Sequence, residues 1–550
     1  MFVRTKKRGE YTYLMIAENR WVEGKVKQKV LHSLGRLDQL QQTGRLDGVL
    51  ASLGRFSEKL AVLGAHQRGE SVTTRTRKVG PALIFERLWR ELGIDRVLNG
   101  LLGERRFEFA VERAVFLTVL HRLFDPGSDR AAEQWKAGYA MAGTEELALH
   151  HLYRAMAWLG TPLPREQQGG RTPFAPRCVK DRIEEAFFDL RRDLFSGVDI
   201  VFFDTTSIYF EGEGGETIGE YGFSKDHRPD RKQMVVGVVL DQEGRPICSE
   251  LGPGQTTDVK SLVPIVDRLR KQFSVNQVCI VADRGMISKE TIQALEHPKR
   301  QWKYILGVRM RKQKEVKGEV LSRGGRYQEV YPKSRIPKAP SPLKVKEVRV
   351  GERRYVVCLN EDQAEKDRRD REAIVGALED ALKSGDKSLI GNKGFRRYVR
   401  TEGKRFSIDP DKIQEEARYD GKWVLTTNLD LSAREVALKY KQLWTVEETF
   451  RSMKSLLETR PIFHKCDETI RGHVFCSFLA LILRKELQDR LERRGWRLEW
   501  NDIIRDLDNL LEMEVRIDGK GYVIRSESQG TVGKVAKACG VALPPTLRSC

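Results

Sequence analysis

The stretch VDIVFFDTTSIYF, residues 198–210, decides how the middle of this chain is expected to fold. Its apolar run ends at Asp204, which is typical of a buried strand that delivers a carboxylate to the edge of a sheet. A second apolar run, VCIVADRG at residues 278–285, ends at Asp283 in the same manner. The two patterns together predict two buried strands, each with an aspartate at its end.

A third acidic residue of interest lies in YKQLWTVEETFRSMK, residues 440–454, whose pattern is helical, with a break near Trp444 and Thr445 as an alternative to one continuous helix. At about 100° per residue, Glu448 points away from Lys454, whereas Glu447 shares a helix face with several useful neighbours. The residues on that face are Tyr440, Leu443, Arg451 and Lys454. We therefore expect Glu447 to be a metal ligand, with Arg451 and Lys454 flanking it as phosphate contacts.

Asp204, Asp283 and Glu447 can meet at one point, because a helix can approach the sheet edge at which the two strands end. Three carboxylates there would hold two Mg²⁺ ions, which is the apparatus of phosphodiester chemistry. A single strand-end aspartate is often a turn or cap residue, but the order and contexts of all three favour catalysis. Arg284, next to Asp283, can either contact DNA or pair with a carboxylate.

The composition favours a multidomain protein with an anionic partner. The chain has 550 residues, which is enough for about two to four domains. Its formal net charge of +20 is more typical of a protein that binds nucleic acid than of one that binds a membrane surface. A soluble basic protein with solvated Lys and Arg is the alternative. The eight cysteines are scattered, which argues against a disulfide framework or a zinc ribbon. We expect no secretory signal, no membrane span and a cytoplasmic location.

Residues 177–298 alternate between strand and helix patterns. Three strand patterns in succession are followed by a helix, a strand and a second helix, an order that matches the first part of an RNase H-like sheet. A second part of the same core, with the Glu447 helix, is predicted at residues 421–490. The expected fold class is therefore multidomain α/β, with an RNase H-like catalytic core in two parts.

Between these two parts, residues 299–420 are predicted to form a β-rich insertion domain. The segment holds 32 Lys and Arg against 20 Asp and Glu, which gives it a net charge of +12. This excess suggests a surface that faces DNA, with a solvated charged helix as the alternative. The arginines chosen as DNA contacts are Arg396, Arg397 and Arg400.

The two ends of the chain are expected to form separate regions. Residues 1–75 are predicted to be a basic region with a β-hairpin, and residues 76–176 a helical DNA-binding region that ends in a Pro-rich linker. Residues 491–550 are predicted to be a C-terminal region, with a possible part in dimerisation, that combines a helix with a strand pair around Asp518 and Gly519.

The spacing of Tyr440, Glu447 and Lys454 resembles the Tyr–two–Arg–three–Glu–six–Lys signature of bacterial insertion-sequence transposases of the DDE class. The stretches FFDTTSIYFEG, VADRGMISKE and YDGKWVLTTN also look similar to that family. The resemblance covers roughly residues 180–485 and extends more weakly to the N-terminal part. One departure is Leu443, which stands at the Arg position and leaves the phosphate contact to Arg451 or Lys441.

The resemblance implies an RNase H-like core in which Asp204, Asp283 and Glu447 bind two Mg²⁺ ions, for which Mn²⁺ can substitute. It also implies that the protein catalyses Mg²⁺-dependent cleavage and strand transfer of an insertion sequence. The implied location is the bacterial cytoplasm, in association with the nucleoid. The implied partners are double-stranded DNA with terminal inverted repeats, target DNA and a second copy of the chain in a homodimer. The insertion would contact the transposon end.

Other interpretations of the sequence remain. The same core fits a metal-dependent DNA nuclease without strand transfer, or a non-catalytic DNA-binding protein. Four possible zinc ligands, His464, Cys466, His473 and Cys476, match no common zinc module, and a buried apolar helix is the preferred interpretation. Trp444 is likewise predicted to be a core residue rather than a base-stacking one.

Overall fold

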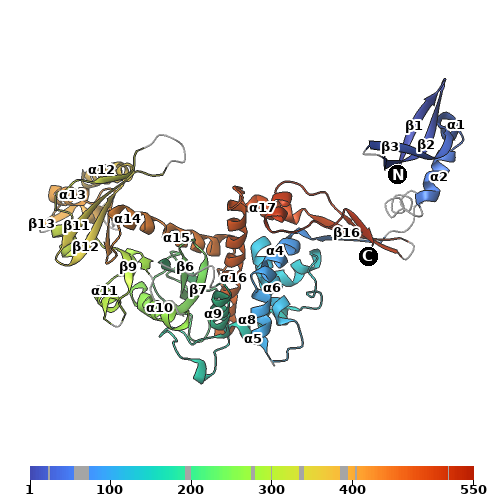
Figure 1. Cartoon of the computed structure of the whole chain (residues 1–550). Helices are drawn as coiled ribbons and strands as arrows, with labels where there is room; N and C mark the ends of the chain where they lie inside the picture. The colour runs from blue at the N-terminus through green and yellow to red at the C-terminus, as the bar shows by residue number, and fades with distance from the viewer. Residues whose placement is uncertain are drawn as a thin grey trace. The chain divides into compact units, whose positions relative to one another are not determined.

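The computed structural model describes residues 1–22, 25–54, 73–103, 105–191, 200–273, 279–298, 300–333, 340–383, 394–402, 405–517 and 520–549. The chain, drawn in Figure 1, divides into two compact units. The first contains Met1–Ile84, Ala137–Met141 and Trp496–Cys550, and the second contains Phe85–Lys136 and Ala142–Gly495. The protein is thus a multidomain, mixed α/β structure, and the two ends of the chain share one unit.

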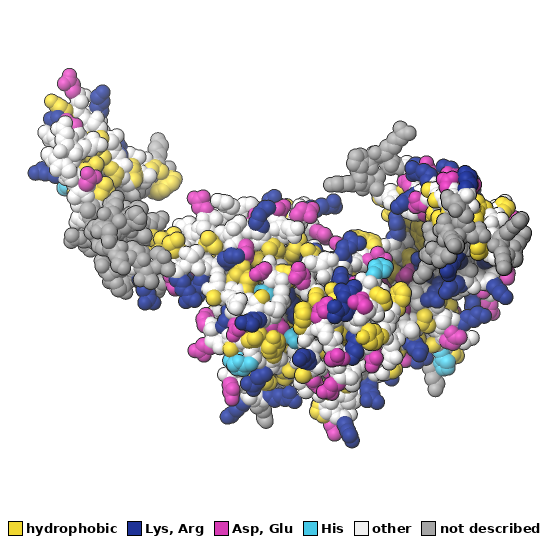
Figure 2. Space-filling model, turned by 180° about the vertical axis from the view of Figure 1, so that it is seen from behind, with side chains coloured by type: hydrophobic (Ala, Val, Ile, Leu, Met, Phe, Trp, Pro, Cys, Tyr) yellow, Lys and Arg dark blue, Asp and Glu magenta, His cyan; other side chains and the backbone are white. Residues whose placement is uncertain are grey.

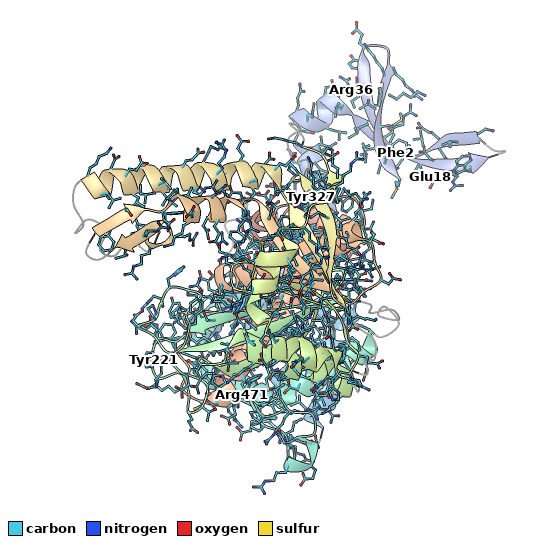
Figure 3. The ribbon with its side chains drawn as sticks, turned by 90° about the vertical axis from the view of Figure 1, so that its left-hand side faces the viewer. Phe2, Glu18, Arg36, Tyr221, Tyr327 and Arg471 are labelled. Atoms are coloured by element: carbon cyan, nitrogen blue, oxygen red, sulfur yellow. The ribbon has the colours of Figure 1, made fainter. Side chains whose placement is uncertain are left out.

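The N-terminal part of the first unit is a three-stranded antiparallel sheet. The predicted hairpin is present as β2 (Tyr11–Val22) and β3 (Lys25–Arg36), and a further strand, β1 (Phe2–Arg8), pairs with β2. The short helices α1 (Leu37–Gln42) and α2 (Arg45–Gly54) follow. Figure 3 labels Phe2, Glu18 and Arg36 on this sheet, one on each strand.

A second sheet of the first unit joins distant parts of the sequence. Its order is β18-β17-β16-β4, and β4 (Thr73–Lys78) pairs antiparallel with β16 (Leu511–Ile517). The remaining strands and helices are β17 (Lys520–Arg525), β18 (Leu547–Ser549), α17 (Trp500–Asp508) and α18 (Val532–Ala538). β16 and β17 are the predicted strand pair, and the predicted turn residues 518 and 519 lie outside the described residues.

The second unit is built on a nine-stranded mixed sheet with the order β10-β11-β12-β15-β9-β8-β5-β6-β7. Three strands form an antiparallel meander at one side of this sheet: β5 (Ile200–Tyr209), β6 (Gln233–Asp241) and β7 (Pro246–Pro253). β8 (Cys279–Ala282) pairs parallel with β5, and β9 (Lys303–Gly307) pairs parallel with β8. All five strands were expected, because each is an apolar run of strand length.

Most of the strands in segment 299–420 belong to the nine-stranded sheet, whereas β13 (Val399–Glu402) and β14 (Arg405–Ile408) pair with each other in a separate two-stranded sheet. The first strand of the segment is β9, and its strands β10 (Gln328–Tyr331), β11 (Leu343–Val350) and β12 (Arg353–Leu359) extend the nine-stranded sheet. The connection is β15 (Lys422–Thr427), which pairs antiparallel with both β12 and β9. Long-range strand pairing of this kind leaves no local signal in the sequence.

The rest of this segment carries the outer elements of the unit. They are the π-helical turn Val316–Val320, α12 (Glu361–Lys383), the short turn Phe395–Arg397, β13 (Val399–Glu402), β14 (Arg405–Ile408) and α13 (Pro410–Ala417). α12 has the bounds that the charged helical pattern predicted. Figure 2 shows Lys, Arg, Asp and Glu side chains interspersed over the outer face of this part, at the right of the view.

Helices cover the sheet on both sides, as Figure 1 shows. α10 (Asp258–Gln272) and α11 (Lys289–Glu296) share a core with β5 and β8 that also includes α9 (Val179–Leu190). On the other side lie α14 (Ala433–Lys441), which contacts β8 and β9, and α15 (Trp444–Arg451), which contacts β5 and β6. α14 and α15 therefore cover the part of the sheet that β5, β6, β8 and β9 form.

The helical segment that was predicted to bind DNA packs against the core of the second unit. Helix α16 (Asp467–Glu492) lies between β7 and the helices α6 (Val111–Phe124) and α8 (Leu149–Gly160). Gly160 and Gly472 let α8 and α16 touch through their backbones, since a Cβ at either position would overlap a carbonyl of the other helix. The neighbouring helices are α4 (Gly80–Glu91), α5 (Ile94–Leu102) and α7 (Asp129–Trp135). None of the described helices has the length and apolar composition needed to cross a membrane.

Candidate active site

Asp204 and Asp283 lie side by side because their strands are neighbours. β5 and β8 run parallel, with Phe203 opposite Ala282, so the next residue on each strand is an aspartate. Asp204 is still within β5, and Asp283 is the first residue after β8, where the chain turns into the short helix Arg284–Met286. The structure therefore brings together the two carboxylates that the apolar runs predicted.

The surroundings of Asp204 destabilise the charged form of its carboxyl group. Burial is the main cause that raises its pKa to about 6, and the charges of Asp283 and Asp258 raise it further. The ammonium of Lys225 and the backbone N–H of Thr205, which donates to Asp204 Oδ1 at 2.7 Å, act in the opposite direction. Two carboxylates that repel each other in a poorly solvated place favour a cation between them.

Tyr440 is tied to this pair through its hydroxyl group. The Tyr440 hydroxyl donates a hydrogen bond of 2.8 Å to Asp283 Oδ1, and burial together with the Asp283 charge raises the pKa of Tyr440. Gly307, the last residue of β9, makes room for this contact. A Cβ at Gly307 would lie less than 3.0 Å from the tyrosine oxygen, closer than real Cβ contacts.

Glu447 is exposed on α15, the helix that packs against the strand of Asp204. Within the described part of the chain, no hydrogen bond or ion pair joins Glu447 to either aspartate. Glu448 points elsewhere: it lines a hollow of about 490 Å³ together with Trp444 and Arg484. Trp444 is 60% exposed, so the prediction that it is a core residue is wrong.

The helix that was expected to run from residue 440 to residue 454 is interrupted twice. α14 ends at Lys441, α15 begins at Trp444, and a π-helical turn occupies Ser452–Leu456. The regular 100° spacing therefore does not hold from Tyr440 to Lys454. Tyr440 reaches the aspartates from α14, a different helix from the one that carries Glu447.

Lys454 lies mostly buried rather than on an open helix face. Its ammonium donates a hydrogen bond of 2.8 Å to Asp226 Oδ1, and the two side chains are 11% and 6% exposed. Burial lowers the pKa of Lys454, an effect that Asp226 opposes. Arg460 Nε lies 3.7 Å from the second oxygen of Asp226. This pair fastens the loop between β5 and β6 to the π-helical turn.

The other predicted DNA contacts lie at the surface. Arg284, Arg451 and Arg396 are exposed. Arg397 lies 3.7 Å from Glu416, and Arg400 lies 3.3 Å from Asp409 and 3.6 Å from Asp411. Leu443, which occupies the Arg position of the signature, is buried at the start of α15.

Lys225 and Asp258, whose charges act on Asp204, were not predicted from the sequence. Thr205 Oγ1 donates a 2.5 Å hydrogen bond to Asp258 Oδ1, at the start of α10. Lys225 Nζ donates to the Thr205 carbonyl at 2.7 Å and lies 3.2 Å from Asp258 Oδ2. An aspartate in the first turn of a helix is common, so the sequence offered no signal that separates Asp258 from an ordinary helix-start residue.

Two of the four possible zinc ligands, His464 and His473, belong to a hydrogen-bonded group with Arg122 and Asp129. Asp129, His464 and His473 are one described group whose ligand atoms all lie within 4.8 Å of one another. Arg122 Nη2, however, lies 2.8 Å from His473 Nδ1, and His473 Nε2 lies 3.2 Å from the Thr459 carbonyl. Burial and Arg122 lower the pKa of His473. His473 Nδ1 also lies 3.0 Å from His464 Nε2, so a neutral His473 ring accepts at Nδ1 and donates through Nε2 to the Thr459 carbonyl. His473 and Cys476 are buried on α16, as predicted.

Comparison with known proteins agrees with these features. A family model described as the transposase DDE domain matches residues 196–483, more than half of the chain. The chain belongs to this family of DDE transposases. Its N-terminal residues 2–67 match the N-terminal domain of IS1634 family transposases, which are insertion-sequence enzymes of transposition.

The similarity of the chain to a solved transposase structure is weak. The cryo-EM structure of the piggyBac transposase synaptic complex with hairpin DNA is 12% identical, with 78% of this chain and 79% of that chain covered and a TM-score of 0.37. That overlap is too weak to carry an argument. No curated protein matches the chain.

Proposed function

We propose that the protein binds the terminal inverted repeats of its insertion sequence and catalyses Mg²⁺-dependent cleavage and strand transfer of the DNA ends. The observation that carries this proposal is the pair of aspartates: Asp204 lies within β5, and Asp283 directly follows the adjacent parallel strand β8. Membership of the DDE transposase family supports it.

The sheet supports the finer proposal of an RNase H-like core. Its part β7-β6-β5-β8-β9 consists of three antiparallel strands followed by two strands parallel to the first. This is the order that the sequence analysis expected of such a core, with β10, β11 and β12 as an extension on the far side of β15. Asp204 lies within β5, and Asp283 directly follows the neighbouring strand β8.

The residues present fit a site for Mg²⁺. Asp204 and Asp283 provide oxygen ligands, and because burial raises the pKa of Asp204, a bound cation would stabilise its charged form. Glu447, on the helix above β5, is the proposed third ligand. Two bound Mg²⁺ ions would activate water or a DNA 3′-hydroxyl and stabilise the leaving oxygen. Tyr440 keeps Asp283 in one orientation through its hydrogen bond.

The proposed partners are DNA and a second copy of the chain. We assign phosphate contacts to Arg284 and Arg451, which are exposed on the elements that carry Asp283 and Glu447, and place the transposon end along the basic segment 299–420. A homodimer that holds two ends is proposed from the family alone.

The function can be tested with a labelled duplex that carries the end of the element. Incubation with Mg²⁺ should cleave the duplex at the end of the repeat, and EDTA should stop the reaction. A supercoiled target plasmid should then receive the cleaved end. Cleavage without joining would favour the nuclease alternative, and binding without cleavage would favour a non-catalytic DNA-binding protein.

Removing the Tyr440 hydroxyl should lower cleavage without removing a ligand. Tyr440→Phe is expected to slow cleavage by about 10- to 100-fold, the usual scale for partners that orient metal ligands, with a higher Mg²⁺ requirement. Gly307→Ala should reproduce the defect, because the added Cβ displaces the tyrosine oxygen. The defect of each variant is measured from the dependence of its cleavage rate on the Mg²⁺ concentration. A normal Mg²⁺ requirement in both variants would show that the hydrogen bond has no such role.

Neutralising the arginines of segment 299–420 should weaken DNA binding in a salt-dependent way. With Arg396, Arg397 and Arg400 all changed to Gln, the slope of log K against log salt should fall by about 0.9 for each phosphate that is no longer neutralised. Titrations at several salt concentrations measure this slope. Arg493→Gln, an exposed position at the end of α16, is the control. An unchanged slope would place these arginines on a solvated face.

A further inference from the structure

The backbone next to Asp204 is held by side chains rather than by β8. The register between β5 and β8 ends at the pair Phe203 and Ala282. Beyond it, the Thr205 backbone N–H donates to Asp204 Oδ1 at 2.7 Å, and the Thr205 carbonyl accepts from the Lys225 ammonium, also at 2.7 Å. The orientation of the Asp204 carboxylate therefore depends on how firmly Thr205 is held.

Asp258 holds Thr205 from the opposite face of the sheet. Successive side chains of a strand point to opposite faces, so the Thr205 side chain points away from the face of Asp204. Its buried hydroxyl donates the 2.5 Å hydrogen bond to Asp258 Oδ1. Lys225 Nζ lies 3.1 Å from the same hydroxyl oxygen and 3.2 Å from Asp258 Oδ2. Thr205, Lys225 and Asp258 thus contact one another in a closed group.

The place of Asp258 links the two segments that follow the proposed metal ligands. Asp258 is the first residue of α10, and one of its contacts, Thr205, directly follows Asp204. Its second oxygen lies beside Gly285, two residues after Asp283, because a Cβ at Gly285 would lie 3.4 Å from Asp258 Oδ2. A carboxylate in the first turn commonly serves only its own helix, whereas the oxygens of Asp258 contact residues of other elements.

The Lys225 ammonium is close enough to Asp204 to compete with a metal ion. Its charge lowers the pKa of Asp204, against the larger effect of burial. An ammonium that paired directly with Asp204 would neutralise the carboxylate and so weaken its attraction for a cation. The negative charge of Asp258 provides Lys225 with a different partner, at 3.2 Å.

We propose that Asp258 is a positioning residue of the candidate active site, which fixes Thr205 and retains Lys225 so that Asp204 is correctly oriented and free to bind a metal ion. This role rests on the proposed function, in which Asp204 is a metal ligand. Asp258 acts through its two neighbours and does not contact the metal. Loss of a residue that orients a metal ligand typically lowers metal affinity or activity by about 10- to 100-fold.

Binding of Mn²⁺ to the full-length protein without DNA, followed by electron paramagnetic resonance, tests the role directly. Thr205→Val removes the hydroxyl and keeps the shape of the side chain, and Asp258→Asn removes the charge. Each should weaken Mn²⁺ binding by about 10- to 100-fold. Thr205→Ser keeps the hydroxyl and should bind Mn²⁺ nearly as tightly as the wild type, which a role in packing alone would not explain. Asp502→Asn, in the first turn of α17, is the control.

A double variant tests the part assigned to Lys225. Asp258→Asn leaves the ammonium without its anionic partner, so it is free to pair with Asp204. Asp258→Asn combined with Lys225→Met should therefore bind Mn²⁺ more tightly than Asp258→Asn alone. Equal affinities of the single and the double variant would overturn this part of the proposal.

Cleavage assays separate this role from the proposed function. In Thr205→Val and Asp258→Asn, the Mg²⁺ concentration that gives half of the maximal cleavage rate should rise by the same factor as the Mn²⁺ dissociation constant. A wild-type protein that binds Mn²⁺ without cleaving DNA would count against the proposed catalysis, while the Mn²⁺ affinities of the variants would still decide the role of Asp258. Wild-type affinity in both variants would overturn that role. A wild-type protein that binds no Mn²⁺ would overturn both the role and the proposed metal site.

Discussion

Asp204→Asn, Asp283→Asn and Glu447→Gln should each reduce DNA cleavage to background while end binding is retained. Each change replaces a charged oxygen ligand by a neutral group of the same shape, so the fold is kept but the cation is no longer held. The loss should be on the order of 10³-fold or more, as for other members of a catalytic set. Cleavage of a labelled end and its binding in a gel-shift assay are measured in parallel.

Glu448→Gln is the matched control for the third position. Glu448 is adjacent in sequence and equally exposed, but it lines the separate hollow beside Trp444 and Arg484. The Glu448→Gln variant should therefore cleave DNA at close to the wild-type rate. Loss of cleavage in Glu448→Gln with full activity in Glu447→Gln would show that the neighbouring carboxylate is the ligand. Weaker end binding in the aspartate variants would point to a role in folding or DNA contact instead.

Local patterns in the sequence predicted the elements well. The apolar run that ends at Asp204 forms the first half of β5, and the run that ends at Asp283 forms β8. Neighbouring residues determine such elements, because side-chain spacing alone decides which face is buried. The aspartates lie beside each other because β5 pairs with β8, and Asp204 lies within β5 rather than at the end of its strand, which the apolar run had suggested.

Features that depend on distant residues were missed. The pairing of β12 with β15 merges segment 299–420 into the core sheet, and the pairing of β4 with β16 joins the two ends of the chain. The interruption after Lys441 lies close to the break considered near Trp444, but the sequence did not show that it lets Tyr440 reach Asp283. Each of these depends on which surfaces meet in three dimensions, and propensity says little about that.

Lys454 is the residue for which sequence and structure suggest different roles. The signature spacing makes it a phosphate contact, whereas the structure buries its ammonium against Asp226. Lys454→Ala would leave the Asp226 carboxylate buried without its main partner. The expected loss in the free energy of unfolding is about 3 kcal/mol, at the lower end for a broken buried pair, because Arg460 remains near the second oxygen of Asp226. Urea unfolding of the purified protein measures it, and cleavage should fall because the loop with Lys225 loosens.

A double variant decides between the two roles. Asp226→Asn combined with Lys454→Met removes both charges and keeps the side-chain volumes, so most of the stability should return. If Lys454 acts only through Asp226, cleavage and the salt dependence of end binding should recover with stability. If Lys454 leaves Asp226 to contact a phosphate when DNA binds, the double variant should be stable yet keep a salt slope that is lower by about 0.9. Because the Lys454 side chain is only 11% exposed in the free protein, we expect the first result.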